Sequence, residues 1–164
     1  MRIFSLMVLG CLCISLKSVG QLAIGDMAPE IKLPDTSGKW KPLSEVKSTL
    51  VLVDFWAAWC YPCVKSMPDV VKLYEKYHAK GLEVYAVSLD KGYYSWIDMC
   101  RQLKLPFILV NDAYGFGGTS CRDYKVSSIP NKMLIKDGKI IGANMSLYDL
   151  EKIIQKELEA LPSH

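Results

Sequence analysis

The chain has 164 residues, a length typical of a single domain that buries its own hydrophobic core. Hydrophobic residues make up 51% of the chain and charged residues 23%, a balance that excludes intrinsic disorder and collagen-like repeats. The net charge is +3, and basic side chains neither cluster nor alternate with aromatic ones. Nucleic-acid binding is therefore not expected.

The first twenty residues have the pattern of a secretory signal peptide. Arg2 precedes an apolar stretch at residues 3–16 that is too short to span a bilayer permanently, and small residues near its end suit cleavage before Gln21. We therefore expect a signal at residues 1–20 and a mature domain at residues 21–164, exported to the periplasm or cell envelope.

The same segment has a second interpretation as a lipoprotein signal. Residues 8–11, Val-Leu-Gly-Cys, resemble a bacterial lipobox, and cleavage there would leave a lipid-anchored Cys11 and a tether. Under this interpretation the lipid is the protein's only attachment to a membrane. A third interpretation keeps the segment as an uncleaved anchor.

Four of the six cysteines lie in the mature domain, namely Cys60, Cys63, Cys100 and Cys121. An oxidising compartment favours a disulfide between closely spaced cysteines, and Cys60 and Cys63 are such a pair. For Cys100 and Cys121 two states are open, a second disulfide or two separately buried thiols. We favour the buried thiols.

In chain order, the mature domain begins with a predicted hairpin. Residues 30–33 and 39–42 flank Asp35-Thr36-Ser37-Gly38, which has the composition of a turn. Residues 49–56 then form a nearly continuous β-branched and apolar run. Such a run is typical of a parallel strand covered on both faces.

A long amphipathic helix is predicted next, between Pro62 and Gly81. Pro68 lies inside it and removes one backbone hydrogen bond, so the axis should kink there. Residues 82–89 form a second buried strand, and residues 95–103 a second helix. The order of these elements is strand, helix, strand, helix.

The last third of the domain holds shorter elements. Residues 107–110 should pair at a sheet edge, and the glycine-rich residues 114–118 should form a flexible loop before one or two helical turns. Asp137-Gly138 supplies the positive φ angles of a tight turn, so residues 133–135 and 139–143 should pair antiparallel.

The final helix begins at Ser146, with Asp149 three residues later in a pattern close to a capping box. Together the elements predict one α/β domain. Its sheet is mixed, parallel in the middle with an antiparallel hairpin at its end.

The chemical centre of the sequence is residues 59–63, Trp-Cys-Tyr-Pro-Cys, where the buried strand ends and the long helix begins. Unpaired backbone N–H groups and the positive end of the helix dipole favour the thiolate of Cys60, which makes it the nucleophile. Cys63, one turn inside the helix, is expected to resolve the mixed disulfide. The expected redox group is this cysteine pair itself, with no bound cofactor.

Three further residues of this segment are candidates for substrate binding: Trp59, Tyr61 and Pro62. The two aromatic side chains flank the nucleophile and could form an apolar rim for an extended substrate. The alternative is that they are core lids at the end of a strand.

Asp54 interrupts the otherwise apolar strand. A buried carboxylate is costly unless it is protonated or paired, so burial should raise the pKa of Asp54. The alternative is an aspartate that faces solvent at the end of the strand.

Residues 53–63, Val-Asp-Phe-Trp-Ala-Ala-Trp-Cys-Tyr-Pro-Cys, resemble the active-site segment of thioredoxins, and residues 24–161 resemble exported TlpA/ResA-type thiol-disulfide oxidoreductases. The resemblance implies a thioredoxin fold, a central mixed sheet flanked by helices on both faces, with an N-terminal β-hairpin extension. It also implies that Pro130 is cis and lies against the Cys60 sulfur, leaving the backbone of Ile129 free to pair with a substrate strand. Asp54 would be the general base for Cys63.

The chain departs from the ResA type at two positions. It has Asp54 in the strand, where that type typically has no aspartate, and Ser66 where that type has a glutamate shortly after the motif. Both departures weigh against a role limited to haem maturation.

The expected function is therefore an exported thiol-disulfide oxidoreductase. We favour a reductant, because Pro62 before Cys63 and Ile129 before Pro130 resemble reducing thioredoxins and no histidine separates the cysteines. The resemblance implies a membrane-embedded thiol donor of the DsbD or CcdA type, and substrates that are disulfide-containing proteins such as apocytochrome c. We expect a monomer.

Three alternatives remain. The same fold hosts oxidants and isomerases. Four cysteines could hold zinc in a non-catalytic module, although a zinc ribbon usually has two closely spaced pairs and Cys100 and Cys121 are 21 positions apart. A peroxidase of the peroxiredoxin type would have threonine three residues before its reactive cysteine, where this chain has Ala57.

Overall fold

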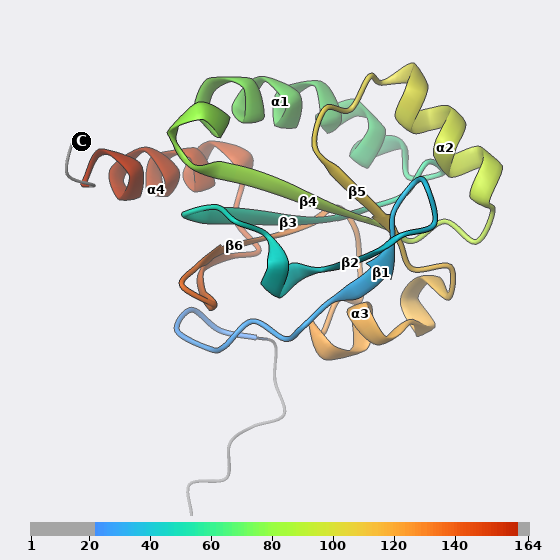
Figure 1. Ribbon diagram of the computed structural model, residues 1–164, viewed down its shortest axis with the longest axis horizontal. Coiled ribbons are helices and arrows are strands. Elements are labelled where there is room, and N and C mark those ends of the chain that lie inside the picture. The colour runs from blue at the N-terminus through green and yellow to red at the C-terminus, as the bar shows by residue number, and fades with distance from the viewer. Residues whose placement is uncertain (1–21, 161–164) are drawn as a thin grey trace, which may run out of the picture.

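The computed structural model of the protein describes residues 22–160 (Figure 1). The predicted signal peptide, with its alternative cleavage sites before Gln21 and before Cys11, lies outside these residues. Within residues 22–160, no helix is long and apolar enough to cross a membrane.

A five-stranded sheet forms the middle of the molecule, with the strand order β5-β4-β3-β6-β7. The strands are β3 (Leu50–Trp56), β4 (Leu82–Ser88), β5 (Ile108–Asn111), β6 (Asn131–Lys136) and β7 (Lys139–Ala143). β3, β4 and β5 run parallel, whereas β6 is antiparallel to β3 and β7 is antiparallel to β6. The predicted mixed sheet is confirmed, including the edge position of β5.

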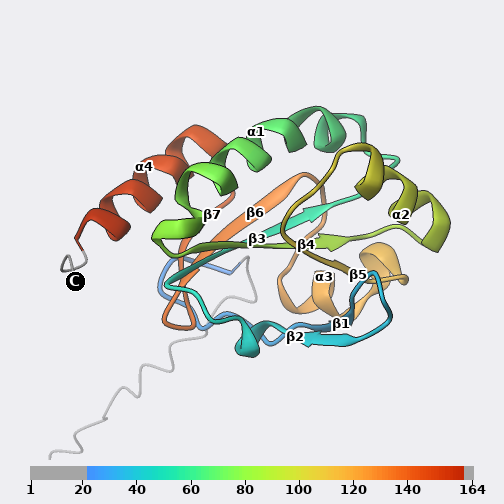
Figure 2. The same cartoon turned by 45° about the horizontal axis from the view of Figure 1, so that its top comes forward.

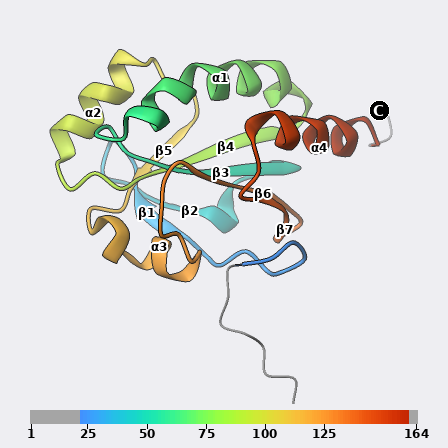
Figure 3. The same ribbon diagram turned by 180° about the vertical axis from the view of Figure 1, so that it is seen from behind.

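Helices cover both faces of this sheet. They are α1 (Tyr61–Tyr77), α2 (Tyr93–Gln102), α3 (Thr119–Asp123) and α4 (Leu147–Glu159). α1, α2 and α4 lie on one face, and α3 lies on the other (Figure 2). The view from behind shows the same layers (Figure 3).

The predicted N-terminal hairpin is confirmed as β1 (Lys32–Pro34) paired antiparallel with β2 (Trp40–Pro42). It lies on the same face of the sheet as α3 (Figure 2). The Asp35 side chain closes its turn, because its Oδ1 atom accepts hydrogen bonds from the Ser37 and Lys39 backbone N–H groups at 2.8 and 3.0 Å.

β3 is the central strand, and all seven of its residues are buried. Its β-branched and apolar side chains suit this position, since α1 and α4 pack on one of its faces and α3 with the hairpin on the other. The strand delivers the chain to the start of α1, where the cysteine pair lies.

α1 begins where the sequence predicts, but the α-helix ends at Tyr77, before the predicted end at Gly81. Cys60 is its N-cap, Pro62 lies in the first turn, and Pro68 lies inside the helix. A short 3-10 helix, His78–Lys80, follows α1 and ends at Gly81. The φ of Gly81 is 109°, in the left-handed region that glycine adopts without strain.

The second hairpin and the last helix are also confirmed. Asp137 and Gly138 both have positive φ, at 50° and 74°, and form the two-residue turn between β6 and β7. Ser146 is the N-cap of α4, and its Oγ accepts a hydrogen bond from the Asp149 backbone N–H at 3.2 Å.

One expectation was wrong: residues 115–117 form a short 3-10 helix rather than a flexible loop. The reason is the buried Asp112, whose carboxylate accepts hydrogen bonds from the Tyr114 N–H and from the backbone and hydroxyl of Ser120. This carboxylate ties the glycine-rich segment to the start of α3. The second helix also begins earlier than predicted, at Tyr93 rather than Ser95.

Candidate active site

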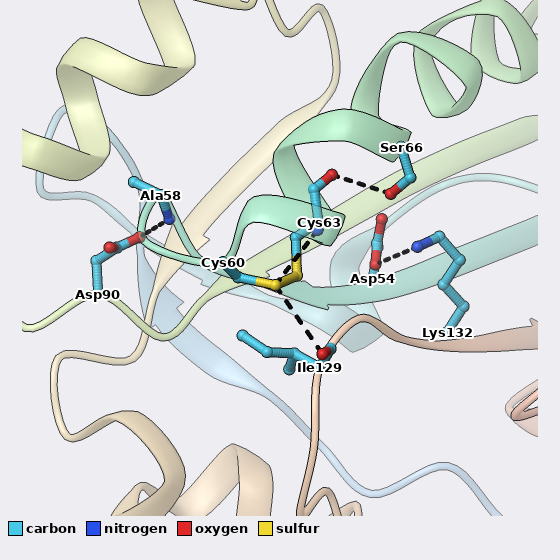
Figure 4. Close-up of a disulfide and its surroundings, with 8 residues drawn as sticks. All are labelled: Asp54, Ala58, Cys60, Cys63, Ser66, Asp90, Ile129 and Lys132. Atoms are coloured by element: carbon cyan, nitrogen blue, oxygen red, sulfur yellow. Dashed lines mark hydrogen bonds and ion pairs between the residues drawn. A yellow bond between two sulfur atoms is a disulfide. The ribbon is translucent and has the colours of Figure 1, made fainter.

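Cys60 and Cys63 form a disulfide at the N-terminus of α1, with an S–S distance of 2.08 Å (Figure 4). The Cys60 sulfur accepts a hydrogen bond from the Cys63 backbone N–H at 3.3 Å. A donor of this kind, together with the helix dipole, stabilises negative charge on the outer sulfur once the disulfide opens. Cys63 is fully enclosed, whereas Cys60 retains 5% exposure.

The cis-proline that the resemblance implies is present at the Ile129–Pro130 bond. The Ile129 carbonyl oxygen lies 3.9 Å from the Cys60 sulfur, and Figure 4 shows Ile129 beside the disulfide on the side opposite α1. The segment before β6 therefore forms the second wall of the site.

Asp54 lies in the middle of β3 and is completely buried. The solvent-facing alternative is therefore wrong. Its Oδ1 atom lies 3.0 Å from the Nζ of Lys132, which is 8% exposed, although neither Asp54 oxygen accepts a hydrogen bond of good geometry. Burial raises the pKa of Asp54, and the Lys132 charge opposes the rise.

In Figure 4 the Asp54 carboxyl group lies between the Cys63 side chain and the Lys132 ammonium group. The carboxyl is thus on the inner side of the disulfide, next to the enclosed cysteine and away from the exposed rim. This is the side from which a base can remove the Cys63 proton.

A second buried carboxylate, Asp90, supports the loop before Cys60. Its Oδ2 accepts hydrogen bonds from the Ala58 backbone N–H and from the Ser88 hydroxyl, both at 2.8 Å. Asn111 donates to the Ser88 hydroxyl at 3.1 Å and to the Asp90 carbonyl at 2.9 Å. This network locks the chain two residues before the nucleophile.

Sequence reasoning missed Asp90, although one signal was available. Asp90 follows the apolar residues of β4, just as the cysteine motif follows β3. Because these two strands are parallel neighbours, the residues after their carboxyl ends lie close together. Lys132 was missed as well, because a lone lysine in a strand reads as a solvated side chain.

Trp59, Tyr61 and Pro62 are exposed around the disulfide, Trp59 by 61% and Tyr61 by 75%. The core-lid alternative is therefore wrong. Trp59 packs against Phe116 with ring centroids 6.3 Å apart, and the two rings border a hollow of about 470 Å³ that also contacts Tyr114. An apolar rim thus adjoins Cys60.

Cys100 and Cys121 are free and buried, as favoured. Burial raises the pKa of Cys100 to about 12 and that of Cys121 to about 11. Neither thiol is activated as a nucleophile. In the part of the chain that the structure describes, no three His, Cys, Asp or Glu side chains are grouped to hold a metal ion.

Comparison with known proteins gives one family match. The family model described as "AhpC/TSA family" matches residues 24–144. The match covers most of the described residues, from the segment before β1 to the residue after β7.

Several relatives are named thiol-disulfide oxidoreductase ResA. The protein from Bacillus thuringiensis subsp. konkukian is 36% identical over 122 residues, which cover 74% of this chain and 69% of the relative. The protein from Geobacillus kaustophilus is 30% identical over 138 residues, which cover 82% and 78%.

Solved structures agree with this picture. The thioredoxin domain of a thiol-disulfide oxidoreductase from Bacteroides vulgatus has a TM-score of 0.78 and 29% identity, covering 84% of this chain and 99% of that one. A thiol:disulfide interchange protein from Bacteroides sp. has a TM-score of 0.77 and 29% identity, covering 85% and 92%. The solved structures thus have the fold of this chain, and both are named for the thiol-disulfide exchange that its cysteine pair can perform.

Proposed function

The chain belongs to the AhpC/TSA family and is a thiol-disulfide oxidoreductase, and from this premise we propose that it reduces disulfides of other proteins in the cell envelope. The observation that carries the proposal is the asymmetry of the cysteine pair. The outer sulfur of Cys60 lies at a helix N-terminus and accepts a backbone hydrogen bond, while Cys63 is sealed behind it.

The proposed reaction begins with the reduced protein. The Cys60 thiolate attacks one sulfur of the substrate disulfide, forms a mixed disulfide and releases the first substrate thiolate, which takes a proton from solvent. Cys63 then gives its proton to the Asp54 carboxylate and attacks the Cys60 sulfur. The second substrate thiolate leaves, and the substrate has gained the two electrons that the protein has lost.

The substrate is proposed to bind along the exposed rim. Trp59, Tyr61 and Pro62 offer apolar contact beside Cys60, and the Ile129 backbone next to the cis Pro130 offers a hydrogen-bonding edge for an extended chain. Proteins with exposed disulfides, apocytochrome c among them, suit such a site.

The oxidised protein must be reduced again after each cycle. In the envelope we propose that a membrane-embedded thiol protein of the DsbD or CcdA type supplies the two electrons by the reverse exchange. The cycle uses no bound cofactor, because both electrons pass through the two sulfurs, and it needs only a monomer.

The test is the reduction potential of the Cys60–Cys63 pair in the mature domain, equilibrated in dithiothreitol or glutathione buffers and read from tryptophan emission. A reductant is expected near about −250 mV or below, close to thioredoxin. A value near about −120 mV, where strong oxidants lie, would reverse the direction and assign disulfide formation instead.

A further inference from the structure

A buried lysine adjoins the carboxyl group behind the disulfide. Lys132 lies in β6 directly opposite Asp54 of β3 in the strand register. Residues opposite each other on neighbouring strands project to the same face of the sheet, and the Lys132 Nζ reaches the Asp54 Oδ1 at 3.0 Å. The cis Pro130 precedes Lys132 by two residues, so the segment that lies against Cys60 also positions this lysine.

The other elements packed around Asp54 bring no competing charge. β4 presents Ala86 opposite Asp54, and α1 presents Cys63. Within residues 22–160, Lys132 is the one charged group that acts on the Asp54 carboxyl. The ionisation of Asp54 therefore depends on two opposing effects, burial, which favours the neutral carboxyl group, and the Lys132 charge, which favours the carboxylate.

A polar pocket adjoins Lys132. Its volume is about 460 Å³, and its lining includes Ser66, Ser128, Asn131, Lys132 and Asn144. Asp54 itself has no exposed surface. The pocket thus brings solvent to the lysine.

We propose that Lys132 is a positioning residue for the exchange reaction: its ammonium group holds Asp54 in the ionised form that can accept the Cys63 proton. The inference rests on the proposed role of Asp54 as base. A carboxyl group enclosed in apolar surroundings is driven toward its neutral form, which cannot accept a proton. A cation at 3.0 Å opposes that drive without touching substrate or sulfur.

The proton balance follows from this arrangement. In the resolution step the proton leaves the Cys63 sulfur and joins the Asp54 carboxylate, so the pair changes from an ionised carboxylate with an ammonium to a carboxylic acid with an ammonium. Asp54 returns the proton to solvent after the protein disulfide has formed, and the ion pair is restored for the next cycle.

The experiment compares Lys132→Met, Lys132→Arg and the control Lys136→Met. Lys136 lies on the same strand but pairs at the surface with Glu157 at 2.7 Å. Each reduced protein is mixed with a synthetic peptide disulfide from pH 6 to 9. The first-order formation of the Cys60–Cys63 bond is followed by tryptophan fluorescence, and circular dichroism checks the fold.

We expect Lys132→Met to slow resolution by about tenfold at pH 7 and to approach the wild-type rate near pH 9, since one pKa unit changes the ionised fraction about tenfold. Lys132→Arg should restore the profile and Lys136→Met should leave it unchanged. In an Asp54→Asn background, Lys132→Met should have no further effect.

A wild-type pH profile for folded Lys132→Met would overturn the inference, as would an equal effect of that substitution in the Asp54→Asn background. If Asp54→Asn itself resolves at the wild-type rate, the role of Asp54 as base fails instead. Should Lys132→Met not fold, carbon NMR titration of Asp54 in reduced wild-type protein decides, because titration above pH 7 would contradict an ionised carboxylate.

Discussion

Asp54 and Cys63 are the two enclosed groups through which the proton of the resolution step passes. Because burial raises the pKa of Asp54, its carboxylate is present above that pKa and is lost as the pH falls through it. The wild-type resolution rate should therefore decrease on acidification.

The Asp54→Asn variant keeps the shape of the side chain but cannot accept a proton. We expect it to slow resolution by about a hundredfold at pH 8, the scale of a lost general base, and to lose the acidic limb of the profile. The measurement is single-turnover oxidation by a peptide disulfide. An unchanged rate between pH 6 and 9 would remove Asp54 from the mechanism.

The other two cysteines of the mature domain, Cys100 and Cys121, are free thiols enclosed in the core. Burial raises the pKa of Cys100 to about 12 and of Cys121 to about 11, so at pH 8 both are protonated and shielded. We expect iodoacetamide to label neither in the folded, oxidised protein and to label both in urea. Mass spectrometry of each sample counts the adducts, and rapid native labelling of either thiol would contradict its burial.

At the scale of elements, the short helices after β5 depend on one buried carboxylate. Asp112 accepts hydrogen bonds from Ser120 in α3 and lies directly against Gly118. A Cβ atom at residue 118 would collide with this carboxylate, which its own hydrogen bonds hold in place. The glycine is therefore required by close approach, since its φ of −70° is ordinary.

We expect Gly118→Ala to lower the free energy of unfolding by about 2 kcal/mol, the usual cost of overpacking. Gly117→Ala is the matched control, because nothing lies within 4 Å of a Cβ atom at that position. Urea unfolding of both variants makes the comparison. Equal stability of the two would show that Asp112 moves aside.

Elements could be predicted wherever the cause was local. The turn at Asp137-Gly138 and the N-cap at Ser146 depend on neighbouring residues, so the sequence pattern was sufficient. The 3-10 helix at residues 115–117 depends on a carboxylate that is buried only after β5 has joined the sheet. Its glycines alone indicated a flexible loop.

At the scale of the whole molecule, the exposed rim beside Cys60 combines distant segments. Trp59 comes from the loop after β3 and packs against Phe116 from the segment before α3. Both rings remain exposed beside the disulfide. Such a surface favours contact with a polypeptide substrate. A small disulfide has to contact only the Cys60 sulfur and would gain little from the two rings.

Trp59→Ser should therefore raise KM for a protein disulfide about fivefold, equivalent to about 1 kcal/mol of contact, and leave the rate with oxidised glutathione nearly unchanged. The control is Tyr148→Ser, an exposed aromatic on α4 that does not line the hollow beside Trp59. Steady-state kinetics with both substrates separate the effects. Equal losses for the two substrates would mean that Trp59 acts on the cysteines rather than on the substrate.

The sequence by itself determined the α/β fold, the order of the main elements and the nucleophile. These features depend on periodicity, on turn residues and on a helix N-terminus next to Cys60, all of which are local along the chain. The resemblance to thioredoxins then predicted the cis Pro130 and the role of Asp54 as general base.

Only the tertiary structure decided what surrounds those groups. Lys132 meets Asp54 because β6 pairs antiparallel with β3 in one particular register, and Asp90 meets Ala58 because β4 ends beside β3. Whether an ionisable side chain is buried, paired or exposed depends on contacts between segments far apart in the chain. Pattern and propensity act over a few residues, so they cannot specify such contacts.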